Sequence, residues 1–301
     1  MIEGGFSEDG SRGFFPEMDE GGCLLSIETA VEAAKEAGRL IRERVKTSKR
    51  VETKSSAHDL VTEVDRQAEE IIRQILLKAH PDHAILGEEG VAPGPEASRE
   101  ALEAHRDHEN LWIVDPIDGT TNFVHGFPYF CVSIALARRG TVEIGVIYDP
   151  MQEECFTAER GKGARLNGEP IRVSEEDALG RSLVATGFPA DYKGARKANT
   201  AGMVRLSSRC RNIRNAGSAA LHLAYVAAGR LTAFWELELN AWDLAAGSLL
   251  VEEAGGRVTD TRGTPYHIGV RHVLATNGRI HEAMLEELRA AEATGFEKQE
   301  G

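Results

Sequence analysis

Helix-like and strand-like patterns alternate along most of the sequence, and this alternation predicts a mixed α and β fold. Apolar residues recur at helical spacing over 25–45 and again after Thr62, which predicts two amphipathic helices. Residues 130–148 follow a hairpin pattern with its turn at 139–140, and an Asn-Gly pair at 167–168 predicts a second hairpin turn. The N-terminal half is therefore expected to be α+β.

From about residue 181 the pattern changes to shorter strands that alternate with helices, as in an α/β fold. Helices are predicted over 218–228, 244–254 and 280–293. The second of these is expected to end at Gly255, because glycine is the usual residue just beyond a helix C-terminus. The C-terminal half is therefore expected to be α/β.

Two short apolar segments, 83–88 and 111–114, predict buried strands that end next to carboxylates. The polar stretch 93–109 is expected to be a surface excursion. No repeat and no long linker interrupts the sequence. The expected divisions are a disordered extension (1–22), two packed subdomains (23–180 and 181–293) and a frayed tail (294–301).

The balance of charge limits the classes of partner. With 48 acidic and 35 basic residues the net charge is -13, which disfavours general nucleic-acid binding because a phosphate backbone requires basic surface. The four cysteines form no CxxC pair, and no apolar run approaches the roughly 18 residues of a membrane span. We expect a cytoplasmic protein without a nucleic-acid or membrane partner, in which metal ions or helix N-termini supply positive charge to any anionic substrate.

The segment WIVDPIDGTTNF (112–123) carries the densest chemical signal. An apolar strand leads to Asp115, a proline turns the chain, and Asp118 follows three positions later. Gly119 and Thr120 then offer backbone N–H groups ahead of a turn or helix, a suitable cradle for an anion beside a cation site. The alternative is that both aspartates only cap turns, since aspartate is common there.

Three other segments each contribute an acidic residue with two interpretations. Glu88 follows an apolar strand in GEEG and is either a ligand or a solvated loop residue. Asp243 in WDLAAG is either a ligand or a simple helix N-cap. Asp65 follows Thr62 at the spacing of a capping box, which needs no catalytic role.

Taken together, these carboxylates indicate a hard cation with oxygen ligands, Mg²⁺ or Mn²⁺, rather than zinc. Neither an HExxH spacing nor a GxxxxGK[ST] loop is present, so a zinc hydrolase and a P-loop nucleotide enzyme are both disfavoured. The chemistry indicated is phosphoryl transfer to water. Ser218 and the cysteines have no base paired with them in the sequence, and no nucleophilic role is predicted for them.

In order along the chain, GEEG, WIVDPIDGTTNF and AWDLAAGSLLVEEAGG resemble the inositol monophosphatase family, and the likeness extends from about Ile27 to Ala291. The resemblance implies a layered αβαβα sandwich of the inositol monophosphatase and fructose-1,6-bisphosphatase type, and a homodimer. It also implies lithium sensitivity and two or three Mg²⁺ ions, with Mn²⁺ as an alternative ion.

The resemblance assigns roles residue by residue. The implied metal ligands are Glu88, Asp115, the carbonyl of Ile117, Asp118 and Asp243. Glu88 and Thr120 match the residues that hold the attacking water, and Asp65 matches the acid that pairs with this threonine. Gly119 and Thr120 match backbone donors to phosphate. Residues 23–180 would thus bind metal and phosphate, and 181–293 would complete the metal and substrate site.

The implied reaction is direct hydrolysis of myo-inositol monophosphate by a metal-activated water. The implied substrate contacts are Asp118, Gly217, Ala219, Glu236 and Asp243. Histidinol-phosphate and fructose-1,6-bisphosphate phosphatases are the nearest alternatives, and a non-catalytic regulatory protein is a third. The effect of an additional carboxylate, Glu238, is left open. Four arginines within 205–214 form either a solvated or dimer-facing surface or a site for a second anionic group.

Overall fold

The computed structural model of the protein describes residues 27–47, 51–53, 60–105, 108–189 and 194–295. The predicted N-terminal extension (1–22) lies outside the described residues, as does most of the predicted tail (294–301). The subdomain boundary at 180–181 stays a prediction.

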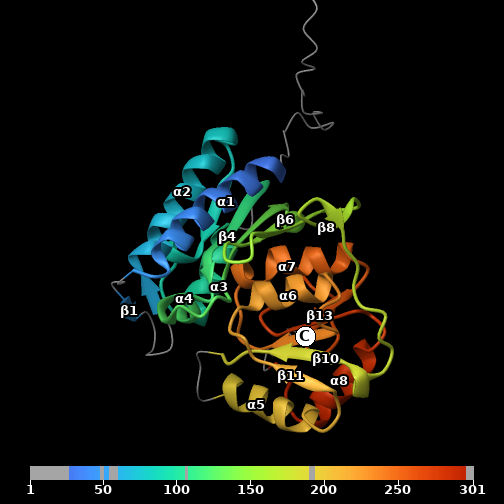
Figure 1. Cartoon of the computed structure of the whole chain (residues 1–301). Helices are drawn as coiled ribbons and strands as arrows, with labels where there is room; N and C mark the ends of the chain where they lie inside the picture. The colour runs from blue at the N-terminus through green and yellow to red at the C-terminus, as the bar shows by residue number, and fades with distance from the viewer. Residues whose placement is uncertain (1–26, 48–50, 54–59, 106–107, 190–193, 296–301) are drawn as a thin grey trace, which may run out of the picture.

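The described elements stack in five layers, shown in Figure 1. Helices α1 (Ile27–Arg44) and α2 (Glu63–Ala79) cover one face of a seven-stranded sheet. Helices α6 (Ala219–Ala227) and α7 (Ala241–Glu253) fill the space between this sheet and a five-stranded sheet. The outermost layer consists of α5 (Ala195–Leu206) and α8 (His281–Ala290). The order αβαβα confirms the expected sandwich.

Among the described residues the larger sheet has the order β3-β4-β5-β6-β7-β8-β9, with only β3 and β4 parallel. Its strands are β3 (Ala84–Gly87), β4 (Asn110–Asp118), β5 (Cys131–Arg138), β6 (Thr141–Asp149), β7 (Glu154–Glu159), β8 (Gly163–Leu166) and β9 (Glu169–Pro170). The turn residues at 139–140 have φ of 48° and 80°, and those at 167–168 have 50° and 88°. Both predicted hairpin turns are therefore confirmed.

The smaller sheet of the described chain has the order β11-β10-β12-β14-β13 and mixes parallel and antiparallel pairs. Its strands are β11 (Asn212–Arg214), β10 (Leu183–Thr186), β12 (Ala233–Glu236), β14 (Val273–Thr276) and β13 (Arg257–Asp260). The remaining elements are β1 (Val51–Thr53), β2 (Leu60–Thr62), α3 (Pro95–Ala104), α4 (Thr120–His125) and the 3₁₀ turns η1 (Glu88–Gly90) and η2 (Leu179–Arg181).

Small residues allow α7 to lie close to both of its neighbours. A Cβ on Gly247 would meet the Leu223 side chain of α6 at 2.5 Å, and one on Gly145 of β6 would meet the Ala246 carbonyl at 2.7 Å. The fully buried Leu223 and Phe156 belong to the core around this helix, where such side chains each contribute about 1.5–3 kcal/mol. This packing fixes the first turn of α7 against the larger sheet.

Three sequence expectations need correction. Residues 93–109 are more than a surface excursion, because Pro95 begins the helix α3, a position where the missing N–H costs nothing. Pro116 does not end its strand: β4 continues to Asp118, and its pairing with β5 shifts register between Asp115 and Asp118. The last helix, α8, ends at Ala290 rather than at 293.

Two helix-end predictions hold. Gly255 adopts φ of 88° just beyond α7, and the Gly256 N–H donates to the Val251 carbonyl at 2.8 Å, which closes the helix as expected. At the start of α2, Thr62 and Asp65 form the capping box. On α1 the buried face consists mainly of alanines, whereas the expected apolar positions Val31 and Leu40 are only partly buried.

Candidate metal and phosphate site

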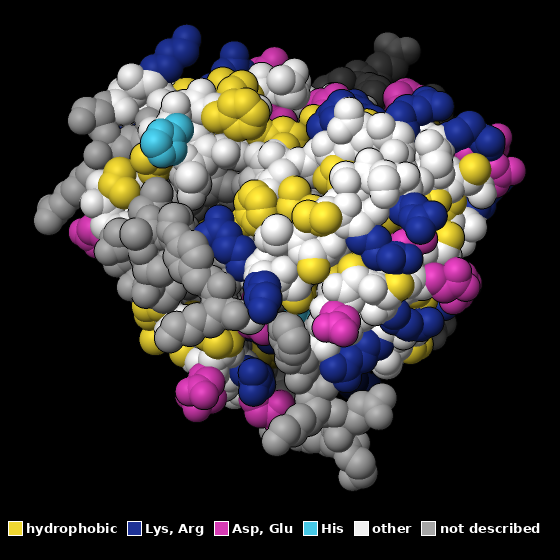
Figure 2. Space-filling model, turned by 90° about the horizontal axis from the view of Figure 1, so that it is seen from below, with side chains coloured by type: hydrophobic (Ala, Val, Ile, Leu, Met, Phe, Trp, Pro, Cys, Tyr) yellow, Lys and Arg dark blue, Asp and Glu magenta, His cyan; other side chains and the backbone are white. Residues whose placement is uncertain are grey.

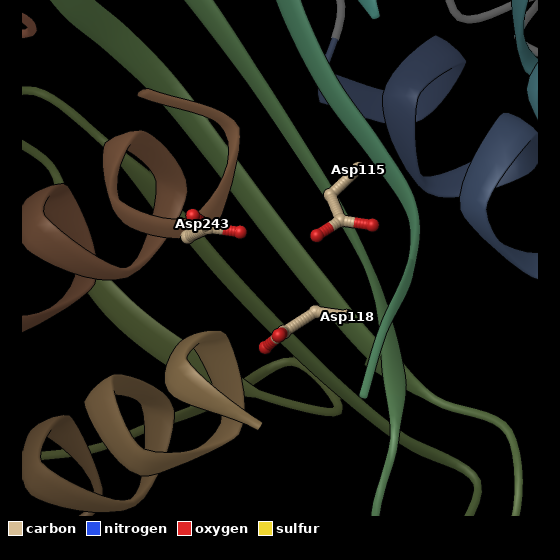
Figure 3. A group of neighbouring side chains, drawn as sticks. All are labelled: Asp115, Asp118 and Asp243. Carbon is tan, nitrogen blue, oxygen red and sulfur yellow. The ribbon is translucent and has the colours of Figure 1, made fainter. Parts of the chain in front are cut away.

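Three aspartates from two distant parts of the sequence meet where the two halves of the molecule join. Asp115 and Asp118 lie at the end of β4, and Asp243 lies in the first turn of α7. Ligand atoms of all three carboxylates lie within 4.8 Å of one another. Figure 3 shows the three side chains pointing toward a common space between the strand and the helices.

The irregular end of β4 orients Asp115. The carboxylate oxygen Oδ1 accepts a hydrogen bond from the Ile117 N–H at 2.9 Å, across the position of Pro116. Because proline has no N–H, the strand cannot pair regularly there, and the local turn places Asp115 and Asp118 on the same side. Burial raises the pKa of Asp115 well above its usual value, and the carboxylates of Glu88, Asp118 and Asp243 raise it further.

Asp118 is held by the start of α6. Its Oδ2 accepts hydrogen bonds from the Ser218 hydroxyl and the Ala220 N–H, both at 2.6 Å. Burial raises the pKa of Asp118 to about 6, although these donors and the Ala219 N–H favour the charged form. Sequence reasoning assigned Ser218 no nucleophilic role, but its contact with Asp118 was not foreseen.

Asp243 is the third residue of α7 rather than its N-cap, which corrects the simpler structural interpretation. Asn240 is the N-cap, and its N–H donates to Asp243 Oδ2 at 2.6 Å. Burial raises the pKa of Asp243 well above its usual value, and the charges of Asp118 and Glu88 raise it further. The Arg271 guanidinium acts in the opposite direction.

Asp65 caps its helix and also contacts the DPIDGTT segment. Its Oδ2 accepts from the N–H and the hydroxyl of Thr62, at 2.9 and 2.6 Å, and the Thr62 hydroxyl oxygen accepts from the Val64 N–H at 3.1 Å, which completes the cap. Its Oδ1 lies 3.0 Å from the Thr120 hydroxyl, which also lies 3.0 Å from the Ile117 carbonyl. Burial raises the pKa of Asp65 to about 6. The helix cap thus also contacts the DPIDGTT segment.

Glu88 follows β3 and begins η1, close enough to Asp65 and Asp115 to affect the pKa of each. A buried residue of α2, Glu69, supports this turn by accepting the Glu89 N–H at 2.8 Å. A Cβ on Gly87 would lie 2.5 Å from the Glu69 carboxyl carbon, so the lack of a side chain at Gly87 lets Glu69 approach this closely. Sequence reasoning missed Glu69, although it follows Asp65 by four residues on one helix face.

The expected phosphate-binding segment begins α4. Gly119 adopts φ of 101°, and its Cβ position would lie 3.0 Å from the Tyr129 carbonyl and 3.2 Å from that of Gly217. Asn122 ties these parts together by donating to the carbonyls of Tyr129 and Ala216 at 2.6 and 2.7 Å. The structure therefore brings Gly119 and Gly217 side by side, through a residue that sequence reasoning did not single out.

Glu236 ends β12 and lies close enough to Asp118 and Asp243 for their charges to raise its pKa, after the larger effect of burial. It is 7% exposed, and no hydrogen-bond donor of the described residues reaches its carboxylate. A Cβ on Gly187 would collide with this carboxylate, and Asn199 holds the Gly187 carbonyl at 2.6 Å. The structure thus keeps an acidic acceptor available beside the aspartate cluster.

The ligand atoms of the aspartate cluster suit a divalent cation. The three carboxylates lie within 4.8 Å of one another and repel, and this repulsion adds to the larger effect of burial in raising the pKa of Asp115 and Asp243. Their donor atoms are all oxygens, which suits Mg²⁺ or Mn²⁺ and not a soft metal. The cluster could therefore bind a metal and, through it, an anionic group.

Comparison with known proteins agrees with this geometry. Residues 25–293 match the model of the inositol monophosphatase family. The chain belongs to the inositol monophosphatase family.

Similar proteins align with nearly the whole of the region that matches the family model. The Nus factor SuhB of Pseudomonas aeruginosa is 46% identical over 265 residues, covering 87% of this chain and 94% of the relative. Inositol monophosphatase 2 of Solanum lycopersicum is 44% identical over 268 residues, covering 88% and 98%. A solved structure, the Thermotoga maritima IMPase, superposes with a TM-score of 0.79 at 36% identity, covering 88% and 97%. Inositol monophosphatase members thus include proteins named for catalysis and proteins named as Nus factors.

Two of the four arginines within 205–214 pair with an acidic residue, and the role of the cluster stays a prediction. Arg205 and Arg209 both pair with Glu287 of α8, at 2.5 and 3.8 Å, in the outermost layer. Figure 2 shows the α5–α8 end of the molecule, where basic and acidic side chains are interspersed. Within the described chain, no helix combines the length and apolar character needed to cross a bilayer.

Proposed function

We propose that this protein is a Mg²⁺-dependent phosphomonoesterase that hydrolyses myo-inositol monophosphate to inositol and phosphate. The observation that carries the proposal is the meeting of Asp115, Asp118 and Asp243 within 4.8 Å, beside the Thr120–Asp65 pair. Oxygen-only acidic clusters of this kind serve phosphoryl chemistry because the phosphate dianion must be neutralised before water can attack.

Glu88, Asp115, Asp118, Asp243 and the Ile117 carbonyl would hold the metal ions. When bound, Mg²⁺ would neutralise the phosphate oxygens, activate the attacking water and stabilise the leaving oxygen. The repulsion among these buried carboxylates supports this role, since a cation would relieve it.

Thr120 and Glu88 would orient the attacking water. The Thr120 hydroxyl has one proton and two acceptors at 3.0 Å, Asp65 Oδ1 and the Ile117 carbonyl, and donates to one of them. The hydroxyl oxygen is then available to accept a proton of the water. The N–H groups of Gly119 and Thr120 would contact the phosphate, at a point where the left-handed Gly119 turns the backbone inward.

Glu236, Gly217 and Ala219 would recognise the alcohol part of the substrate. Glu236 is a nearly buried acceptor that finds no donor in the described chain, and ring hydroxyls would supply the missing hydrogen bonds. A polyol such as inositol can present two adjacent hydroxyls to one carboxylate. This complementarity supports inositol monophosphate over a simple alkyl phosphate.

Two alternatives on the same scaffold remain to be compared. A bisphosphate needs a cation for its second phosphate, and two candidate arginines, Arg205 and Arg209, are engaged with Glu287 in the outer layer. Histidinol phosphate has an amine that Glu236 could also bind.

A third alternative is a regulatory role, which the name Nus factor of two relatives indicates. Such a role would not require the carboxylate cluster to turn over substrate. Homodimerisation, lithium sensitivity, cytoplasmic location and the lack of a nucleic-acid partner stay predictions.

The test is a panel of phosphate esters assayed for phosphate release with Mg²⁺ and with excess chelator. We expect inositol monophosphate to be the fastest substrate, and release to stop on chelation. Release from histidinol phosphate or fructose-1,6-bisphosphate tenfold faster than from inositol monophosphate would overturn the substrate assignment. No release from any ester, or release that survives chelation, would overturn the proposed reaction.

A matched variant separates alcohol recognition from chemistry. Glu236→Gln is expected to lower kcat/KM for inositol monophosphate about tenfold, because an amide oxygen is a weaker acceptor than a carboxylate. The same variant should hydrolyse an aryl phosphate without ring hydroxyls at nearly the wild-type rate. Equal losses on both esters would mean that Glu236 does not contact the alcohol.

A further inference from the structure

The segment that joins Glu236 to Asp243 has a candidate substrate contact at one end and a candidate metal ligand at the other. A buried cationic side chain, that of Arg271, contacts the middle of this segment. The Arg271 guanidinium, in a residue only 8% exposed, donates to Asn240 Oδ1 at 2.6 Å and to Glu238 Oε2 at 3.1 Å. This cluster lies outside the roles assigned above, and it accounts for the additional carboxylate Glu238 that the sequence left open.

The backbone of the segment is held in an uncommon conformation. Glu238 has φ of 60°, in the left-handed region that glycine adopts freely and residues with a long side chain adopt rarely. Its N–H donates to His272 Nδ1 at 3.2 Å, and the next N–H, of Leu239, donates to the Arg271 carbonyl at 2.9 Å. Such conformations persist where the surroundings hold them, and they gather at functional sites. Here the surroundings are the two residues just before β14.

A continuous route of contacts leads from Arg271 to the carboxylate cluster. Arg271 fixes the Asn240 side chain, and the Asn240 N–H donates to Asp243 Oδ2 at 2.6 Å. This hydrogen bond holds the Asp243 carboxylate, a ligand atom of which lies within 4.8 Å of those of Asp115 and Asp118. The planar guanidinium suits this task because it can donate to two partners in a fixed geometry, which a lysine cannot do.

We infer that Arg271 is a positioning residue that holds Asp243 in place for a divalent cation, with Glu238 as its counter-ion. The inference rests on the proposed function, in which Asp243 is a metal ligand. The arrangement is more than an ion pair, because the same guanidinium that pairs with Glu238 also holds the Asn240 side chain, and the Asn240 N–H contacts Asp243.

The test measures Mn²⁺ binding directly, by the loss of the electron paramagnetic resonance signal of free Mn²⁺ on titration with protein. Arg271→Met is expected to raise the Kd for Mn²⁺ about tenfold or more, the range typical of residues that orient metal ligands. Arg271→Lys, which keeps the charge but loses one contact, is expected to raise it about threefold. Asn240→Ala leaves the Arg271–Glu238 pair intact and should also raise it about threefold.

Arg230 provides a matched control. It makes a two-pronged pair with Glu154, both contacts 2.6 Å, and has no contact with the carboxylate cluster. Arg230→Met is expected to leave the Mn²⁺ Kd within about twofold of wild type, even if it lowers the melting temperature as much as Arg271→Met does. A role in stability alone would change melting temperatures and not the Kd.

Two results overturn the inference. If Arg271→Met binds Mn²⁺ as tightly as Arg230→Met, Arg271 does not position Asp243. If Arg271→Met does not fold, Asn240→Ala decides, and a Kd within about twofold of wild type then overturns the route through Asn240. Failure of the proposed function is distinguishable, because wild-type protein itself would then bind no Mn²⁺ and release no phosphate.

Discussion

Two buried polar clusters in this molecule differ in how well their charges and hydrogen bonds are satisfied. The carboxylate cluster of Asp115, Asp118 and Asp243 concentrates like charges within 4.8 Å, and burial raises the pKa of each carboxyl. The second cluster surrounds His281, at the start of α8. There Nε2 lies 2.9 Å from the Thr259 hydroxyl and Nδ1 lies 2.9 Å from the Thr276 hydroxyl.

The His281 cluster has one self-consistent arrangement of protons. The Thr259 hydroxyl donates to the Asp260 carbonyl, so it accepts from Nε2–H, and Nδ1 in turn accepts from the Thr276 hydroxyl. The Thr276 oxygen then accepts from the Gly278 N–H. Every donor has an acceptor, and the imidazole is neutral. This cluster stabilises the fold, whereas the carboxylate cluster lowers stability in exchange for affinity for a cation.

The largest expected effect comes from breaking the carboxylate cluster. Asp115→Asn should lower kcat/KM roughly 10³-fold or more, because one ligand of the proposed cation site is lost. The metal-free variant should be at least as stable as wild type, since a repelling charge has been removed. Phosphate release and thermal melting with and without Mg²⁺ measure both effects.

The outcome that contradicts this comparison is specific. If Asp115→Asn retains Mg²⁺-dependent turnover, Asp115 is not a ligand. If the variant is strongly destabilised without metal, the carboxylates stabilise the fold rather than oppose it.

Removing the imidazole tests the satisfied cluster. His281→Ala removes the acceptor of the Thr276 hydroxyl and the donor to the Thr259 oxygen, and it leaves a cavity, which together should lower the free energy of unfolding by about 3 kcal/mol. The Kd for Mn²⁺ should stay unchanged, because the cluster has no contact with the carboxylates. Urea unfolding measures the first quantity, and the exposed His108, changed to Ala, serves as the control with an expected change below about 0.5 kcal/mol.

The pH dependence of the same variant sharpens the comparison. Burial lowers the pKa of His281 from 6.5 to about 4, so the folded protein binds fewer protons than the unfolded chain between these values. The stability contributed by the neutral ring is therefore complete above pH 6.5 and is lost as the pH falls toward 4. The difference in unfolding free energy between wild type and His281→Ala should shrink by up to about 3 kcal/mol over this range.

A pH-independent difference would mean that His281 is not held neutral in the fold. Because both proteins share every other titrating group, only the ring at position 281 can produce the expected trend.

The smallest expected effect concerns the hydrogen bond from the Ser218 hydroxyl to Asp118, which joins the two halves of the molecule. Ser218→Ala removes one donor to Asp118 and the side-chain cap of α6, and each loss should amount to about 1 kcal/mol. We expect the Mn²⁺ Kd to rise about fivefold with a modest loss of stability. Ser182→Ala, which removes a buried hydroxyl contact with the Ala178 carbonyl, should lower stability similarly without changing the Kd.

Equal Mn²⁺ affinities in Ser218→Ala and Ser182→Ala would show that the start of α6 does not orient Asp118. The carboxylate cluster would then depend on β4 and α7 alone.

Several elements were predictable because their signals are local. The turn at 167–168 needs two residues that tolerate positive φ, and Asn-Gly supplies them. The capping box of Thr62 and Asp65 spans one helical turn, so spacing alone identifies it. The effect of Pro116 was harder to predict, because whether a proline ends a strand or only shifts its register depends on the partner strand.

The supporting residues of the site were not predictable from spacing. Glu69, Asn122 and Arg271 each act on a segment at least 7 residues distant in sequence, through one or two hydrogen bonds. Nothing in the surrounding pattern distinguishes them from residues on a solvated helix face or loop. Their partners become evident only when the layers are packed.

The sequence by itself determined which kinds of atom this protein offers to a metal ion. Acidic side chains, backbone carbonyls and small residues at fixed local positions specify an oxygen-ligand site and its helix caps, because side-chain type and short spacing do not depend on the rest of the fold. Only the tertiary structure decided which carboxylates meet, which are held by Ser218 and Asn240, and which acceptor is left without a donor. The physical reason is that repulsion, burial and hydrogen bonding between residues far apart in the sequence, such as Asp115 and Asp243 at 128 positions, exist only after the two sheets have packed against α6 and α7.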